Sequence, residues 1–266
     1  MVGSLFGALA DLVLPRTCAG CGVPAVMLCR ACAGLLAVPR LAEPRRFPWG
    51  FPPTVAAGAY AGPVRPAILA FKERGRAELA VPLGAALALA VAVVVSAVPG
   101  PPRPVALVPV PSSRESLRVR GRDHVRELTA RAVIELRPFG IPAAEARLLR
   151  RRGRVQDSAG LSAGQRRANL AGTFERSAAG SAASAGALLV LVDDVVTSGA
   201  TLTEAAAVLV ADRAGEAAPV LAAVVAATPR AAPGHRCAGR PQAVRERSSR
   251  VPRSTVGSPE EGLASS

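Results

Sequence analysis

Apolar and polar positions follow two different patterns along the middle of the chain. Short continuous apolar runs, such as 188–192 and 219–228, predict buried strands, whereas apolar residues at helical spacing over 122–137 predict an amphipathic helix. Apolar strands that alternate with helices indicate an α/β domain with a mainly parallel sheet flanked by helices. The predicted strands are 54–60, 105–110, 188–192 and 219–228, and the predicted helices are 63–72, 122–137 and about 201–212.

The longest apolar stretch, residues 79–98, has no charge over twenty positions and is long enough to span a bilayer. Seven of these residues are alanine, and Pro82 and Gly84 interrupt the first turn. Arginine flanks both ends, so charge asymmetry gives the stretch no orientation. We therefore expect a buried helix of the α/β domain and no stable membrane span, with a membrane helix as the alternative.

Changes in composition divide the chain into four segments. Residues 39–53 contain five prolines, which predicts a stiff linker between an N-terminal part (1–38) and the α/β domain (54–228). The N-terminal part is expected to hold a short amphipathic helix over 1–14 and a cysteine module. Apolar residues are scarce in the tail, 229–266, which is expected to be basic and disordered. The beginning of the sequence does not resemble a signal peptide, which favours a cytoplasmic protein.

Basic residues outnumber acidic ones, with 33 Lys plus Arg against 19 Asp plus Glu and a net charge of +14. Lys72 is the only lysine. This balance favours polyanionic partners such as phosphate compounds, nucleic acid or an acidic membrane surface, and a compositional drift toward arginine is an equal alternative. Aromatic residues make up 3% of the chain, which argues against a base-stacking surface.

Four of the five cysteines lie within fifteen residues in two CxxC pairs. Each pair can present two thiolates to one ion, and two pairs close a tetrahedral zinc site. Protein side chains would fill all four positions, so such a zinc would be structural. Two disulfides or unpaired thiols are the alternatives. The predicted zinc ligands are Cys18, Cys21, Cys29 and Cys32.

The segment 188–202 combines an apolar strand, two acids and a hydroxyl-rich turn that opens a helix. Backbone amides in such a turn can bind an anion, and Gly199 lets the backbone approach it closely. Asp193 and Asp194 follow the strand, where α/β sheets bind ligands, and can accept hydrogen bonds from sugar hydroxyls. An ordinary strand–turn–helix with an acidic pair is the alternative. The hydroxyl-bearing residues of the turn are Thr197, Ser198 and Thr201.

This segment resembles the phosphoribosyl-pyrophosphate (PRPP) loop of type I phosphoribosyltransferases, hydrophobics-D-D-x-x-T-x-G-x-T. With the cysteine module in front, the order of segments over residues 7–228 looks like the ComF family, a double zinc ribbon followed by a phosphoribosyltransferase-like domain. ComF proteins are associated with natural competence, the uptake of single-stranded DNA. The other segments that carry the resemblance are FKERG (71–75), VPVPSS (108–113), 118–131 and 152–174.

The resemblance implies roles for individual residues. Asp193 and Asp194 would be the catalytic acids that hold the ribose hydroxyls, and Mg²⁺ would arrive with PRPP. Arg120 and the arginines of 150–154 would neutralise pyrophosphate or cover the site. The remaining implied PRPP-binding residues are Val195, Val196, Thr197, Ser198, Gly199, Ala200 and Thr201, and the implied pyrophosphate-binding residues are Ser112, Ser113 and Arg114.

Two functions remain open at this point. One is a PRPP-dependent phosphoribosyltransferase that acts on an unidentified base or amine. The other is a non-catalytic PRPP- or nucleotide-sensing protein that binds single-stranded DNA and the DNA-uptake machinery. The family's usual residues are replaced at 121–124 and 156–161, and no side chain is an evident general base, so the acceptor stays undefined.

Overall fold

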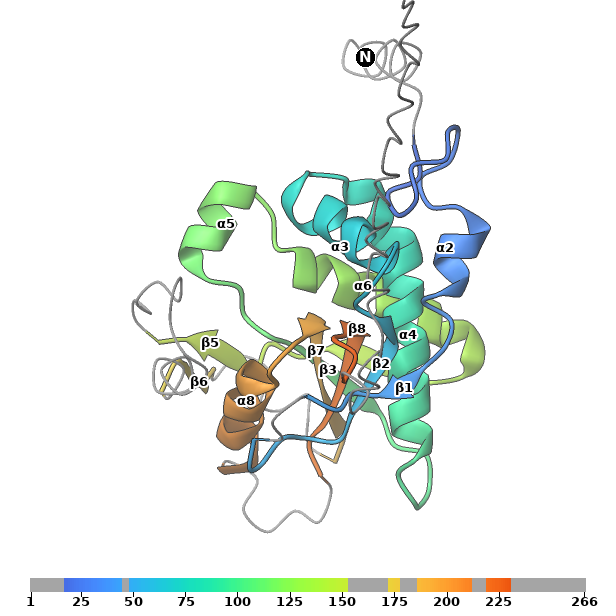
Figure 1. Ribbon diagram of the computed structural model, residues 1–266. Helices are drawn as coiled ribbons and strands as arrows, with labels where there is room; N and C mark the ends of the chain where they lie inside the picture. The colour runs from blue at the N-terminus through green and yellow to red at the C-terminus, as the bar shows by residue number, and fades with distance from the viewer. Residues whose placement is uncertain (1–16, 45–47, 153–171, 178–185, 212–218, 231–266) are drawn as a thin grey trace, which may run out of the picture. The chain divides into compact units, whose positions relative to one another are not determined.

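The computed structural model describes residues 17–44, 48–152, 172–177, 186–211 and 219–230 of the chain (Figure 1). The described residues belong to one compact unit. The helix predicted over 1–14, most of the 152–174 segment and nearly all of the predicted tail lie outside the described residues. The division of the chain into four segments therefore stays a prediction.

A six-stranded sheet forms the centre of the fold, in the order β1-β2-β8-β7-β3-β4. All neighbouring strands are parallel except β1, which pairs with β2 in the antiparallel direction. β5 and β6 form a separate antiparallel pair. The strands are β1 (Arg40–Leu41), β2 (Thr54–Ala59), β3 (Val105–Pro109), β4 (Ala143–Glu145), β5 (Leu149–Arg151), β6 (Phe174–Arg176), β7 (Leu188–Val196) and β8 (Leu221–Ala227).

Helices cover both faces of the sheet, which confirms the predicted α/β class. One apolar core joins the sheet to α3, α4 and α6, and a second core joins the opposite face to α8 (Figure 1). Both faces of the central strands are therefore buried, as is usual for parallel sheets. The helices are α2 (Arg30–Gly34), α3 (Val64–Glu73), α4 (Ala80–Ser96), α5 (Arg114–Arg120), α6 (His124–Leu136) and α8 (Ala200–Ala211), with 3₁₀ turns at Ala77–Leu79 and Arg137–Phe139.

The uncharged stretch folds as the predicted helix, α4, packed against α6 and the sheet. Leu83, Leu87 and Val91 are buried at helical spacing, and a side chain at Gly84 would lie 2.5 Å from Arg131 Cβ, so glycine permits the close crossing with α6. By length and composition alone, the helical run 77–96 could cross a membrane, but half of its most apolar window is buried inside the protein. Core helices commonly meet that criterion, so it is weak evidence for a span.

The cysteine segment packs on the same core as the sheet. Ala19, Met27 and Leu28 contact that core, and Leu36, just after α2, is 2% exposed within it. Arg76 Nη1 donates to the carbonyl of Thr17 at 2.8 Å. The segment is therefore fixed to the helix layer by apolar packing and by a side-chain hydrogen bond.

Candidate functional site

The predicted phosphate loop lies at the carboxyl edge of the parallel sheet, as expected. One detail differs, because β7 does not end before the acids but continues through them to Val196, paired with β8 as far as Ala227. Successive side chains of a strand point to opposite faces. Asp193 and Asp194 therefore have different surroundings, although they are adjacent in sequence.

Asp194 is 3% exposed and is surrounded by donors from three elements. Its Oδ2 lies 2.6 Å from Lys72 Nζ on α3 and 3.0 Å from His124 Nε2 at the start of α6. Its Oδ1 accepts the backbone N–H of Val195 at 2.7 Å. Both oxygens of this carboxylate thus have protein partners.

The charges around Asp194 stabilise its ionised form. Burial opposes ionisation, but the hydrogen bond from His124 and the charge of Lys72 outweigh it and hold the pKa of Asp194 well below its usual range. Burial likewise disfavours the charged form of Lys72, but the neighbouring Asp194 raises the pKa of Lys72 above its ordinary value. The two groups form a mutually stabilised ion pair at neutral pH.

Asp193 is half-buried, and its surroundings favour the protonated acid. Its Oδ1 accepts the backbone N–H of Asp194 at 2.8 Å, and no donor to its Oδ2 is present among the described residues. Burial and the negative charge of Asp194 raise the pKa of Asp193 to about 8, while Lys72 partly opposes this rise. Asp193 is thus the acid of the pair that has a free oxygen and can exchange a proton near neutral pH.

The turn after β7 has an open side and a covered side. Thr197 and Ser198 are exposed, and the backbone N–H groups of Ser198 and Gly199 have no acceptor within the described part of the chain. These amides precede α8, which begins at Ala200. The arrangement suits an anion at a helix N-terminus.

Gly199 adopts a φ of +76°, a conformation that side-chain-bearing residues rarely take. A Cβ at this position would lie 2.7 Å from Phe51 Cε2 and 3.3 Å from Pro44 Cγ. The proline-rich segment therefore packs over this glycine. This contact was not predicted from the sequence, and it means that the space next to Gly199 is filled by protein on that side.

The other residues of the loop differ in what they can offer a ligand. Val196 and Ala200 are buried in the core or against it, and Val195 is half-buried, so these three can contribute backbone groups only. Thr201 is half-buried in the first turn of α8. The hydroxyls of Thr197 and Ser198 are thus the most accessible side-chain donors of the loop.

The predicted pyrophosphate residues follow β3 at the same sheet edge, and two of them have structural roles. Ser113 caps α5, because its Oγ accepts the N–H of Ser116 at 3.0 Å, and Ser112 Oγ donates to Asp123 Oδ1 at 3.4 Å. Arg114 is exposed on α5. Arg120 is half-buried at the end of α5, and its Nη1 lies 3.5 Å from His124 Nδ1.

The arginines after residue 149 separate into two groups. Arg151 donates from Nε to the carbonyl of Pro111 at 3.1 Å, lies over the ring of Phe174, and interacts electrostatically with Asp193. Arg150 and Arg152 instead pair with Glu175 on the neighbouring strand. Arg151 is therefore the described arginine of this group that interacts with Asp193, while residues 153 and 154 lie outside the described part.

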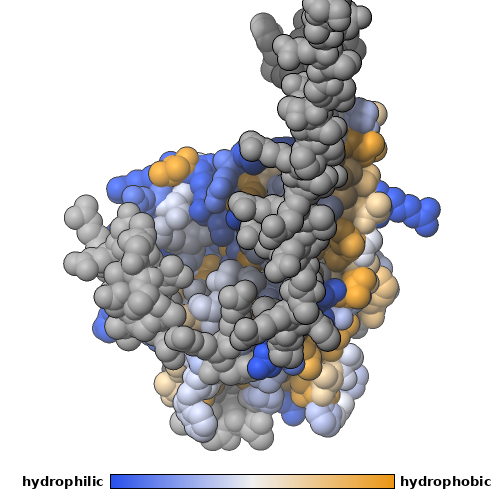
Figure 2. Space-filling model, viewed as in Figure 1, coloured by the Kyte–Doolittle hydropathy of each residue, from blue (hydrophilic) through white to orange (hydrophobic). Residues whose placement is uncertain are grey.

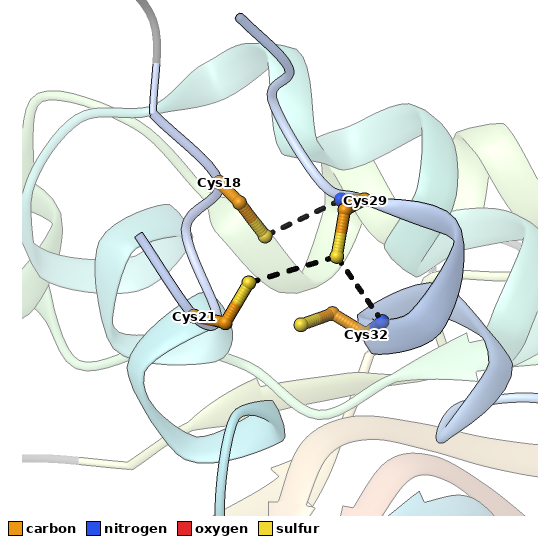
Figure 3. Close-up of side chains that lie close together, drawn as sticks. All are labelled: Cys18, Cys21, Cys29 and Cys32. Carbon is orange, nitrogen blue, oxygen red and sulfur yellow. Dashed lines mark hydrogen bonds between the residues drawn. The ribbon is translucent and has the colours of Figure 1, made fainter. Parts of the chain in front are cut away.

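The four predicted zinc ligands converge on one point (Figure 3). Their Sγ atoms all lie within 4.8 Å of one another, and Cys21 Sγ is 3.6 Å from Cys29 Sγ. A tetrahedral ion with sulfur at about 2.3 Å needs sulfur–sulfur separations of about 3.8 Å, so the cluster fits with little movement. No disulfide joins these four residues. They can hold a metal ion.

Without a cation, the two buried cysteines differ in how readily they ionise. Burial and hydrogen bonds from the other cysteines raise the pKa of the Cys32 thiol far above its usual range. Burial also opposes ionisation of Cys18, but backbone N–H groups, including that of Cys29 at 3.3 Å, outweigh it and lower the pKa of Cys18 to about 6. A divalent cation would supply the positive charge that the remaining thiolates need.

An apolar pocket of about 260 Å³ lies elsewhere, between the end of α4 and residues 99–103, beside Leu188 at the start of β7. It lies at the opposite edge of the sheet from the acids. Viewed as in Figure 1, hydrophilic surface gathers around α5 and hydrophobic surface follows α4 (Figure 2).

Comparison with known proteins does not identify the chain. No protein-family model matches it, and a search of the curated proteins finds no matching relative.

Proposed function

We propose that this protein binds PRPP and is a phosphoribosyltransferase-like protein of the ComF type. The observation that carries the proposal is the geometry after β7. A half-buried carboxyl with a free oxygen, Asp193, is followed by a turn whose amides have no acceptor among the described residues. A sugar phosphate needs this combination, because hydroxyls require an acceptor and a phosphate requires several donors.

Each part of the proposed site has a task in phosphoribosyl transfer. Asp193 accepts hydrogen bonds from the ribose hydroxyls, and residues 197–201 bind the 5′-phosphate. Arg151, which interacts electrostatically with Asp193, and Arg120, which lies beside His124, stabilise the departing pyrophosphate, whose Mg²⁺ is held largely by the ligand and water. The protein then acts by positioning an acceptor against a positively charged anomeric carbon.

The cysteine cluster holds a structural zinc ion in this proposal. All four ligands are protein thiols, so no position stays open for a substrate or a reactive water. The ion would hold together a short segment with a small core of its own and attach it to the helix layer. Four described cysteines that form no disulfide and serve as zinc ligands suit a reducing compartment, and we place the protein in the cytoplasm on that ground.

Binding of single-stranded DNA is the second candidate, favoured by the arginines of α5. This helix has no buried residue, and Arg114 and Arg118 are exposed on it, beside the proposed PRPP site. In this alternative the site would sense PRPP or a nucleotide, and α5 would contact the DNA backbone. A partnership with the DNA-uptake machinery would follow from it.

Turnover distinguishes the two candidates. Purified full-length protein is incubated with PRPP, Mg²⁺ and a panel of bases and amines, and released pyrophosphate is measured. Transferase activity predicts release that depends on one acceptor and is lost in Asp193→Ala. Saturable PRPP binding without release, together with salt-sensitive binding of single-stranded DNA, would support the sensing protein instead.

A further inference from the structure

The chain uses arginine at every basic position except one, and that exception lies in the candidate site. Lys72 is the only lysine among 33 basic residues, and its ammonium is 2.6 Å from the buried Asp194. Its side chain is 27% exposed, so the ammonium lies between the buried carboxylate and solvent. Asp194 is its only hydrogen-bonding or ion-pair partner among the described residues.

The residue next to Lys72, Phe71, is held by contacts with Arg122. The guanidinium of Arg122 lies 4.4 Å from the centre of the Phe71 ring, and its Nη1 donates to the carbonyl of Phe71 at 3.0 Å. Arg122 also forms an ion pair with Glu127 on α6. The residue immediately before Lys72 is thereby tied to the beginning of α6.

Asp194 is suited to anchoring these cations and poorly suited to binding sugar. Lys72, His124 and the Val195 amide occupy both of its oxygens, and the carboxylate is almost completely buried. A ribose hydroxyl could reach it only by displacing one of these donors. Its neighbour Asp193 has a free oxygen among the described residues and is half-buried.

His124 extends the anchor to a second cation. His124 Nδ1 lies 3.5 Å from Arg120 Nη1, and because an arginine only donates hydrogen bonds, this contact suits a ring whose Nδ1 carries no proton. We assign the ring proton to Nε2, which then donates to Asp194 Oδ2 at 3.0 Å. A continuous chain of contacts thus runs from Lys72 through Asp194 and His124 to Arg120 at the end of α5.

We propose that Lys72 and Arg120 are the phosphate-binding cations of this site, and that Asp194 and His124 are positioning residues that hold them. This inference rests on the proposed PRPP site. It reassigns Asp194 from a ribose ligand to an anchor. The shape of its charged group explains why position 72 is a lysine. An ammonium can donate one N–H to Asp194 and keep two for a phosphate, whereas a guanidinium would pair with both carboxylate oxygens.

The direct test is calorimetric titration of the full chain with inorganic pyrophosphate and with PRPP, both with Mg²⁺. Lys72→Met should weaken binding of both at least tenfold. Arg65→Met removes an exposed cation from the same helix and should leave both affinities unchanged. Equal affinities for the parent and Lys72→Met would overturn the inference while leaving the PRPP site intact. A parent that binds neither compound would instead overturn the proposed function.

Lys72→Met leaves a buried carboxylate without its cation and can fail to fold. The double variant Lys72→Met/Asp194→Asn removes both charges together and keeps the test available. It should fold and still bind pyrophosphate at least tenfold more weakly than the parent. Asp194→Asn alone keeps the lysine and should weaken binding about threefold. A double variant with the parent's affinity contradicts the role of Lys72.

Magnetic resonance can distinguish contact between Lys72 and the ligand from a structural role of this residue. The chain has one lysine and two histidines, so their signals are simple to assign. Lysine labelled with ¹³C gives one ε-carbon signal, which should shift on addition of pyrophosphate with the midpoint found by calorimetry. In His235→Asn, the remaining imidazole should show its proton on Nε2. A lysine signal that does not move, or a proton on Nδ1, would contradict the assignment.

Two replacements of His124 test whether this residue positions Arg120, because its two ring nitrogens have different partners. Glutamine places an N–H donor near Nε2 and can keep the contact with Asp194, while it leaves Arg120 without its acceptor. We expect His124→Gln to weaken pyrophosphate binding several-fold and His124→Ala to weaken it further. Equal binding in the parent and in both folded variants would remove His124 from the proposed chain.

Discussion

Asp193 and Asp194 are neighbours in sequence, but their carboxyl groups titrate in opposite directions. Lys72 and His124 hold the pKa of Asp194 below its usual range, whereas burial and the charge of Asp194 raise the pKa of Asp193 to about 8. The strand continues through both residues, so they face different layers of the protein. An acidic pair that looks uniform in sequence therefore consists of one internal anion and one exchangeable acid.

The raised pKa of Asp193 predicts a specific pH dependence of stability. The folded state holds this proton more tightly than the unfolded state, so the associated stabilisation is present at low pH and is lost as pH rises from about 4 to about 8. The asparagine of Asp193→Asn does not titrate. The free energy of unfolding of this variant, relative to that of the parent, should therefore increase over this interval and then level off. Urea unfolding at pH 5, 7 and 9 measures the difference.

Asp194→Asn should behave in the opposite way. The lowered pKa of Asp194 means that its stabilisation is present at neutral pH and is lost only in acid, so the variant should be less stable than the parent at pH 7. The difference should shrink as the pH falls below about 4. A pH-independent difference for both variants would show that the two acids are not shifted apart.

Gly199 should be needed for the stability of the fold. Alanine at a φ of +76° costs about 1–2 kcal/mol, and its Cβ would also meet the Phe51 ring. Gly199→Ala should therefore lower the free energy of unfolding by at least this amount. Adding Phe51→Ala should relieve the contact but not the backbone strain, which can be seen by comparing both single variants with the double variant. No loss of stability in Gly199→Ala would mean that the turn has a different conformation.

The cysteine cluster should bind about one equivalent of zinc, as expected for a closed four-thiolate site. Cys32→Ser should reduce the metal content to about a tenth of an equivalent or less and detach the segment from the helix layer, because metal binding supplies much of its folding energy. Cys237→Ser is the matched control and should keep the metal. Elemental analysis of protein purified without chelator decides between these outcomes, and a metal-free parent would exclude zinc.

The basic tail should contribute to polyanion binding but not to PRPP binding. Residues 229–266 carry seven arginines and three glutamates. A chain that ends at Thr228 should keep the parent's PRPP affinity. Its affinity for single-stranded DNA should depend less steeply on salt, because fewer phosphates are neutralised. Identical salt slopes would show that the tail does not touch DNA.

Sequence alone predicted the parts of the fold that have a strong local pattern. The strands β3, β7 and β8 are continuous apolar runs, and α4 and α6 have long helical patterns. The strand β1 was not predicted, since it has two residues and lies in a proline-rich segment, where its pairing with β2 depends on tertiary contact. The N-cap role of Ser113 could have been predicted, because a serine directly before a helix commonly has this role.

The candidate site was predicted in its location and only partly in its arrangement. The motif places the acids, the turn and α8 together, because they are consecutive in the chain. The contacts of Asp194 with Lys72 and His124 join three segments that are far apart in sequence, and such contacts cannot be predicted from the spacing of residues within one segment. The cover of Phe51 over Gly199 was missed for the same reason.

The measurement that tests the central claim most directly is calorimetric titration of the full chain with PRPP in Mg²⁺. The account predicts saturable binding at one site per chain, competition by pyrophosphate, and a loss of at least tenfold in a Thr197→Val/Ser198→Ala double variant whose circular dichroism matches the parent. These two side chains are exposed, so their replacement should leave the fold intact. Absence of PRPP binding by the folded parent, or unchanged binding by the double variant, would contradict the proposed site.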